Sequence, residues 1–190
     1  MLSGVVVPIY LISSYVNDEE QLVKILTNVM RAAMSCKPAV DPLVHQYKQT
    51  SVQRERSHLK HCIQKVHRTA LRGSCPTRLL SRCVKLVTHL ARCDIDLDYA
   101  AVGRNIIVYC RVKTVEALSD LQQMIDSGRL NQLFSGIFTA FANTGLLSRL
   151  FSSICSPFAS PAVIVFLSTE EYQRTWSLLT SDGKLSLIIV

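Results

Sequence analysis

The chain has 190 residues, of which 48% are hydrophobic and 18% are charged, and its formal net charge is +7. This composition is typical of a folded globular protein and excludes an intrinsically disordered chain. The length suits one domain, or one domain with a helical appendage, and no apolar run reaches the roughly 20 residues that a bilayer-spanning helix needs.

The N-terminal stretch contains the first predicted element, a buried strand over Val5–Ile12. A secretory signal would have a similar apolar centre, but no Lys or Arg precedes this one, which favours the strand. A helix is predicted over Asp18–Ser35, with Asn17 as its N-cap and Lys37-Pro38 as its end. Residues 1–36 are then either the first strand and helix of an α/β domain or the start of a separate helical domain.

Most of the positive charge lies in residues 43–93, which contain eleven Lys or Arg and a single acid, Glu55. Residues 1–42 hold three bases and four acids, and residues 94–190 hold seven bases and nine acids. The apolar periodicity predicts helices over residues 43–72 and from Thr77 onward, with a break at Gly73-Ser74-Cys75-Pro76. Residues 37–93 are therefore expected to form a basic helical hairpin, inserted in the α/β domain or preceding it.

The second helix of this hairpin is expected to present four cations on its outer face: Arg78, Arg82, Lys85 and Arg92. Such a surface could hold nucleic acid, anionic lipid or an acidic partner, or could simply be solvated. Aromatic residues are almost absent here, which disfavours stacking on single-stranded bases.

One compact cluster has metal-ligand chemistry. It consists of His58, His61, Cys62 and His67, and zinc accepts imidazole and thiolate ligands. On a helix, His58, His61 and Cys62 share a face, whereas His67 lies off by a turn and a half. The spacing matches no known zinc motif, and surface histidines are the simpler account, so no metal or cofactor is predicted while the zinc alternative stays open. The seven cysteines form no C-x-x-C pair and are expected to be reduced thiols in the cytosol.

Known catalytic signatures are absent from the sequence, which contains no G-x-S-x-G, P-loop or H-E-x-x-H motif. The alternating acids of DIDLDYA, which are Asp94, Asp96 and Asp98, would line one face of a strand, and a solvated edge strand explains them more simply than a metal site. The chain is accordingly predicted not to be an enzyme.

The second half of the chain alternates strands and helices. Strands are predicted over Asp94–Ala100, residues 105–112 and Ala162–Leu167, with a further strand at Leu185–Val190. Thr114 is expected to cap the helix after the second of these, and another helix opens at Ser168-Thr169-Glu170-Glu171.

Gly128 interrupts the helix that Thr114 opens. It lies between two halves of one apolar stripe, where either a C′ glycine with positive φ or a glycine inside a continuous helix would fit. A turn at Gly128 would point Asp126, Ser127 and Arg129 outward, where a partner protein could contact them.

With these residues and this order of elements, the tract IIVYCRV-x-T-x-EAL-x-x-L…SG-x-L…VIVFLSTEEY resembles the N-terminal-domain family of the TNF-receptor-associated death-domain adaptor (TRADD). The resemblance covers about residues 94–180, and residues 143–160 lengthen one connection relative to the family. It implies an α+β fold, namely a ferredoxin-like α/β sandwich with an antiparallel sheet. The family also opens with a strand that leads through Ser-Ser into a helix, similar to IYLISS here, which favours placing residues 1–36 in the sheet domain.

The resemblance also implies a function. The family binds other proteins through its sheet, with first-strand aromatics contributing, and Tyr10 is the residue that matches here. The leading hypothesis is a non-enzymatic adaptor or scaffold in cytosolic immune or cell-death signalling, with TRAF-like partners or self-association. The alternative is a protein that binds nucleic acid or anionic membranes through the basic helices of residues 43–93.

Overall fold

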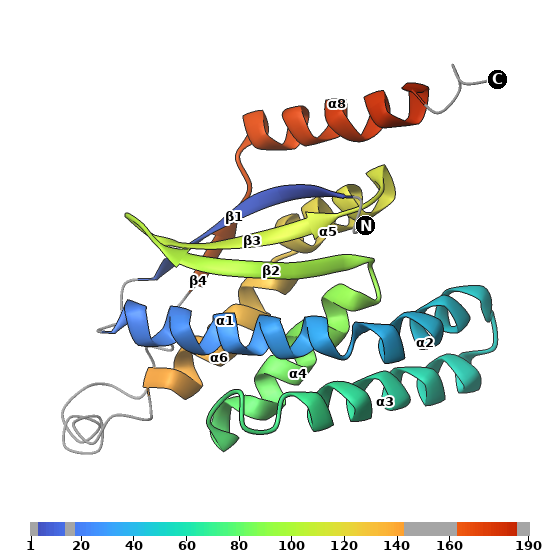
Figure 1. The fold of residues 1–190 in the computed structure, drawn as a ribbon. Coiled ribbons are helices and arrows are strands. Elements are labelled where there is room, and N and C mark those ends of the chain that lie inside the picture. Colours follow the sequence, from blue (N-terminus) through green and yellow to red (C-terminus); the bar gives the residue numbers. More distant parts are fainter. Residues whose placement is uncertain (1–3, 14–17, 143–162, 186–190) are drawn as a thin grey trace.

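The fold is described by a computed structural model, which covers residues 4–13, 18–142 and 163–185, with side chains up to residue 181. It is a mixed α+β structure built on one antiparallel sheet with strand order β2-β3-β1-β4 (Figure 1). The strands are β1 (Val5–Ser13), β2 (Ile95–Val102), β3 (Ile106–Val112) and β4 (Val163–Phe166). β1 lies inside the sheet, paired with β3 on one side and β4 on the other. The N-terminal strand therefore shares a sheet with the strands of the second half of the chain.

One face of this sheet is buried. Side chains alternate along each strand, so that Val7, Ile9 and Leu11 of β1 point into the core while their neighbours point outward. The inward residues of β3 are likewise fully buried. They form a single apolar cluster with residues of α1 (Glu19–Ser35), α4 (Thr77–Ala91), α5 (Val115–Asp126) and α6 (Arg129–Ala142).

Two further helices, α2 (Lys37–Gln49) and α3 (Gln53–Ala70), extend away from the sheet and pack on each other (Figure 1). Their own buried contacts form a separate cluster of three residues, Val40, Val44 and Ile63. The last helix, α8 (Thr169–Leu185), lies beside β1 and α5, on the opposite side of the molecule from α3 in Figure 1. Among the described helices, none has both the length and the hydropathy required to cross a bilayer.

One helix start was predicted correctly, and the structure decides between the two alternatives left open at Gly128. Thr114 caps α5 by accepting a hydrogen bond from the Ala117 amide at 3.1 Å. Gly128 has φ +68°, in the left-handed region, so the chain turns there and α6 starts afresh at Arg129. This positive φ rules out the continuous helix and selects the C′ glycine.

Other boundaries were predicted wrongly. Asp18, not Asn17, caps α1, since its Oδ1 accepts from the Gln21 amide at 3.0 Å, and Asn17 lies outside the described residues. The helix expected over residues 43–72 is two helices, because α2 begins at Lys37 and ends before Thr50. Leu185 belongs to α8, not to the strand predicted at Leu185–Val190, whose other residues lie outside the described part of the chain.

Candidate interaction surfaces

The outer face of the sheet consists of the strand side chains that point away from the core. Neighbouring strands bring nine uncharged residues of this face together: Val6, Pro8, Tyr10, Ile12, Tyr99, Ile107, Tyr109, Ile164 and Phe166. None of them belongs to the buried core. In an antiparallel sheet with one free face, that face is normally polar, so this composition calls for an explanation.

Two aromatic stacks span this outer face. The rings of Tyr10 and Phe166, which pair across β1 and β4, lie 5.0 Å apart between centroids at an angle of 17°. Tyr99 and Tyr109 pair across β2 and β3 and stack at 4.1 Å and 16°. Such pairs contribute about 0.5–1.5 kcal/mol each beyond area burial. They hold the rings in fixed positions, so the face is a preformed surface.

Solvent reaches this face. The exposed fractions are 56% for Ile164, 45% for Tyr99, 41% for Ile12 and 38% for Val6. Ile12 and Ile164 lie directly opposite each other in the β1–β4 register. At the other margin of the face, a guanidinium nitrogen of Arg111 donates to the carboxylate of Asp98 at 2.7 Å. The surface therefore has an apolar centre with an ion pair at one side.

The residues that the sequence singled out for partner binding lie in two places. Tyr10 is on the outer face of the sheet, in the stack with Phe166. Asp126, Ser127 and Arg129 are exposed at the turn between α5 and α6. The charge of Arg129 helps to lower the pKa of His89, which places Arg129 near α4 and thus on the helical side of the sheet. Tyr10 and the turn are therefore separate features.

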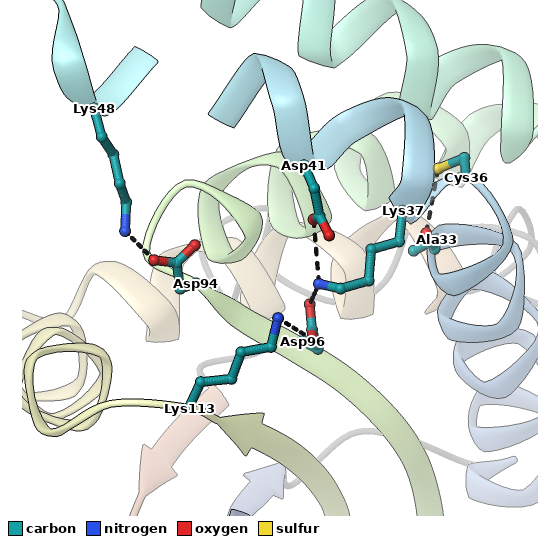
Figure 2. Close-up of polar contacts among 8 residues, drawn as sticks. All are labelled: Ala33, Cys36, Lys37, Asp41, Lys48, Asp94, Asp96 and Lys113. Carbon is teal, nitrogen blue, oxygen red and sulfur yellow. Dashed lines mark hydrogen bonds and ion pairs between the residues drawn. The ribbon is translucent and has the colours of Figure 1, made fainter. Parts of the chain in front are cut away.

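A buried ionic cluster joins α2 to the sheet (Figure 2). Nζ of Lys37 lies 2.5 Å from Oδ1 of Asp96 and 3.4 Å from Asp41, while Nζ of Lys113 lies 3.9 Å from Oδ2 of Asp96, beyond hydrogen-bond distance. Burial alone would lower the pKa of Lys37, but the hydrogen bonds and negative charges of Asp96 and Asp41 outweigh it and raise that pKa. Lys48 pairs with Asp94 at a second, exposed contact between α2 and the start of β2.

This cluster corrects part of the interpretation of DIDLDYA: β2 is an edge strand, as predicted, but its acids do not line one solvated face. Asp94 precedes β2, Asp96 is only 9% exposed, and a register irregularity separates Leu97 from Tyr99. The three acids thus bind three different cations, namely Lys48, Lys37 and Arg111. Alternation in the sequence did not reveal this, because Lys37 and Lys48 come from α2, far away in the chain, and Arg111 comes from the neighbouring strand β3.

The four cations predicted on the outer face of α4 have different environments. Arg78, Arg82 and Lys85 are exposed, but the guanidinium of Arg82 lies along α6, next to Gly136. Arg92 is not on an outer face. Its guanidinium carbon lies 4.4 Å from the centre of the Tyr47 ring, and it donates to the Tyr47 hydroxyl. Much of this basic face is therefore used to pack helices together.

The proposed zinc ligands are only partly brought together. Sγ of Cys62 lies 3.6 Å from Nε2 of His58 on α3. His67 faces the opposite way, buried and hydrogen-bonded to Oγ1 of Thr88 at 2.9 Å, and burial lowers its pKa to about 4. Within residues 4–13, 18–142 and 163–185, no three His, Cys, Asp or Glu side chains converge as a metal site would require.

The thiols of the described residues are all free, and two of them, Cys83 and Cys110, are buried in the core. Burial raises the pKa of Cys110 to about 12, so this thiol behaves as a small apolar side chain. Cys155 lies outside the described residues.

Comparisons with protein-family models, with curated proteins and with solved structures find no match to this chain.

Proposed function

We propose that the chain is a non-enzymatic protein-interaction module whose docking surface is the outer face of the sheet. The observation that carries this proposal is the exposed, uncharged and aromatic character of a face that solvent would otherwise make polar. The partner that fits this face is a protein with an apolar patch that covers it and with polar groups that contact Asp98 and Arg111 at its margin.

Two further features support the same assignment. The antiparallel strand order β2-β3-β1-β4, with helices packed on one face, supports the ferredoxin-like sandwich that we propose for this chain. The tract over residues 94–180 resembles the TRADD N-terminal family, which uses such a sheet for protein contacts. A role as an adaptor in cytosolic immune or cell-death signalling follows from that resemblance, with TRAF-like proteins as first candidate partners.

Substitution on the face tests the proposal. Ile164→Asp introduces a charge at its most exposed apolar position, so binding to a TRAF-like partner, measured by calorimetry or by pull-down from animal-cell lysate, should fall at least tenfold. Leu178→Asp is the matched control, because Leu178 of α8 is 46% exposed and is not part of the outer face. Sedimentation of both variants separates self-association from binding to another protein.

Equal binding by wild type and Ile164→Asp would contradict the proposal, provided that circular dichroism shows both proteins folded. Equal loss in Ile164→Asp and Leu178→Asp would contradict it as well, because the effect would then not be specific to the sheet.

A further inference from the structure

The outward face of α3 carries a straight row of basic side chains. Its members are spaced by four, three, four and three residues, which keeps them on one face of a helix with 3.6 residues per turn. All of them are exposed: Arg54, His58, His61, Lys65 and Arg68. Arg72, also exposed, follows directly after the helix. We call Arg54 to Arg72 the α3 row.

The opposite face of α3 explains this orientation. Ile63 and His67 are its buried residues, and they fix α3 against α2 and α4. Because the buried face is held in this way, the row must point to solvent. Figure 1 shows α3 at the edge of the molecule farthest from α8.

No acid in the described part of the chain forms an ion pair with the row. Among the described residues, none of the five ion pairs includes a side chain of α3. The single acid of α3, Glu55, accepts a hydrogen bond from the Thr50 hydroxyl at 2.5 Å, at the start of the helix. By contrast, Lys37, Lys48 and Lys113 elsewhere in the chain each have a carboxylate partner. The cations of the α3 row are thus available for an external polyanion.

The shape of the row favours a linear polyanion. With a rise of about 1.5 Å per residue, Arg54 and Arg72 lie roughly 27 Å apart along a nearly straight line, comparable to about eight base-pair steps of a duplex. A membrane-bound amphipathic helix needs a free apolar face to enter the lipid, but the apolar residues of α3 are used inside the protein. An anionic bilayer is therefore the poorer fit.

The neighbouring aromatic residue excludes stacking on unpaired bases. Tyr47 is the only aromatic residue of the basic segment, and its ring is covered by Arg56 at 5.0 Å and Arg92 at 4.4 Å. Recognition would then involve phosphates and not bases.

We propose that the α3 row binds the phosphate backbone of a nucleic-acid duplex, without sequence preference and independently of the protein contacts of the sheet. RNA and DNA duplexes offer the same phosphate chemistry. The row neutralises about three to four phosphates, so the logarithm of the association constant should fall with the logarithm of salt concentration with a slope of about −3.

Fluorescence anisotropy with 20-bp RNA and DNA duplexes of arbitrary sequence tests this on the full chain. Between 50 and 200 mM salt the affinity should fall roughly 40-fold or more. The variant Arg54→Gln/Lys65→Gln/Arg68→Gln should bind at least 30-fold more weakly at 100 mM salt, with a slope of about −1, because Arg72 remains. Lys24→Gln/Arg31→Gln/Arg104→Gln removes the same charge from exposed residues outside α3 and should stay within threefold of wild type.

Four results would overturn the proposal. They are undetectable duplex binding by wild type, equal weakening in the two triple variants, a tenfold preference for RNA or DNA, and row-dependent binding to phosphatidylserine vesicles without duplex binding. Circular dichroism of each variant confirms that a lost signal is not lost structure. None of these results bears on the sheet face, so the two proposals fail separately.

Discussion

The sheet with the helices packed on it, called the sheet body below, differs from the α2–α3 pair in what stabilises it and in what it exposes. The body has one continuous apolar core, while α2 and α3 share a cluster of three buried residues and are joined to the rest by polar contacts and by apolar packing on α4. The body exposes an apolar sheet face, and α3 exposes a basic row. α4 is basic, like α3, but its apolar residues pack in the core of the sheet body. A high density of basic residues therefore indicates where a helix is exposed, but the apolar contacts decide which structural region the helix belongs to.

Removing a large side chain from either core should show the difference between the two regions most clearly. Phe134→Ala should lower the global free energy of unfolding by about 3–5 kcal/mol, since Phe134 is fully buried in the main core. Ile63→Ala should act on the small cluster, so amide exchange should accelerate in α2 and α3 while the sheet amides stay protected. Denaturant unfolding with hydrogen–deuterium exchange measures both. Equal acceleration across the sheet in Ile63→Ala would show that the two regions unfold as one.

The ion pairs between α2 and the β2 region provide a second test, because one pair is buried and the other is exposed. Lys37→Met leaves the carboxylate of Asp96, which is 9% exposed, without its closest cation, and should destabilise the protein by about 3 kcal/mol. Lys48→Met removes a pair that is 42% exposed on both sides and should change stability by about 0–1 kcal/mol. Urea titrations of both variants at neutral pH give the comparison. Similar losses would mean that burial of the Lys37–Asp96 pair has no energetic consequence.

Acid should loosen the contact between α3 and α4. Burial lowers the pKa of His67 from 6.5 to about 4, so the unfolded chain takes up a proton before the folded chain does. The stability due to neutral His67 is complete above pH 6.5 and is lost as pH falls toward 4, by roughly 2–3 kcal/mol. In His67→Gln the slope of stability against pH should be smaller in this window. His89, whose pKa is also about 4, keeps part of the slope. An unchanged slope in His67→Gln would contradict a buried neutral His67.

Gly128 tests a backbone turn of the sheet body, between α5 and α6, and its substitution should have a modest effect on stability. Its φ of +68° strains any side chain, although nothing lies within 4 Å of an added Cβ. Gly128→Ala should therefore lower stability by about 1 kcal/mol, and Gly128→Val by about 1–3 kcal/mol. Thermal unfolding of both variants checks the order. A more stable Ala variant would mean that α5 and α6 form one helix in solution.

Local signals predicted the sheet well. β1, β3 and β4 are rich in β-branched and aromatic residues. At Gly128 the sequence allowed either a turn or a continuous helix, and the positive φ of the structure selects the turn. The break between α2 and α3 was missed, since Thr50 to Val52 contain neither Gly nor Pro. The packing of Arg92 on Tyr47 could not be predicted from the sequence pattern, because the two residues are 45 positions apart. The same periodicity that pointed to α4 would have found the α3 row, had residues 54–72 been placed on one helical wheel.

The most direct test of the account is a crossed binding experiment with two variants and two ligands. Ile164→Asp is expected to lose the protein partner and keep the duplex, while Arg54→Gln/Lys65→Gln/Arg68→Gln is expected to keep the partner and lose the duplex. This pattern would establish the outer face of the sheet as a docking surface distinct from the α3 row. Loss of both ligands in a folded Ile164→Asp variant, or of neither, would contradict it.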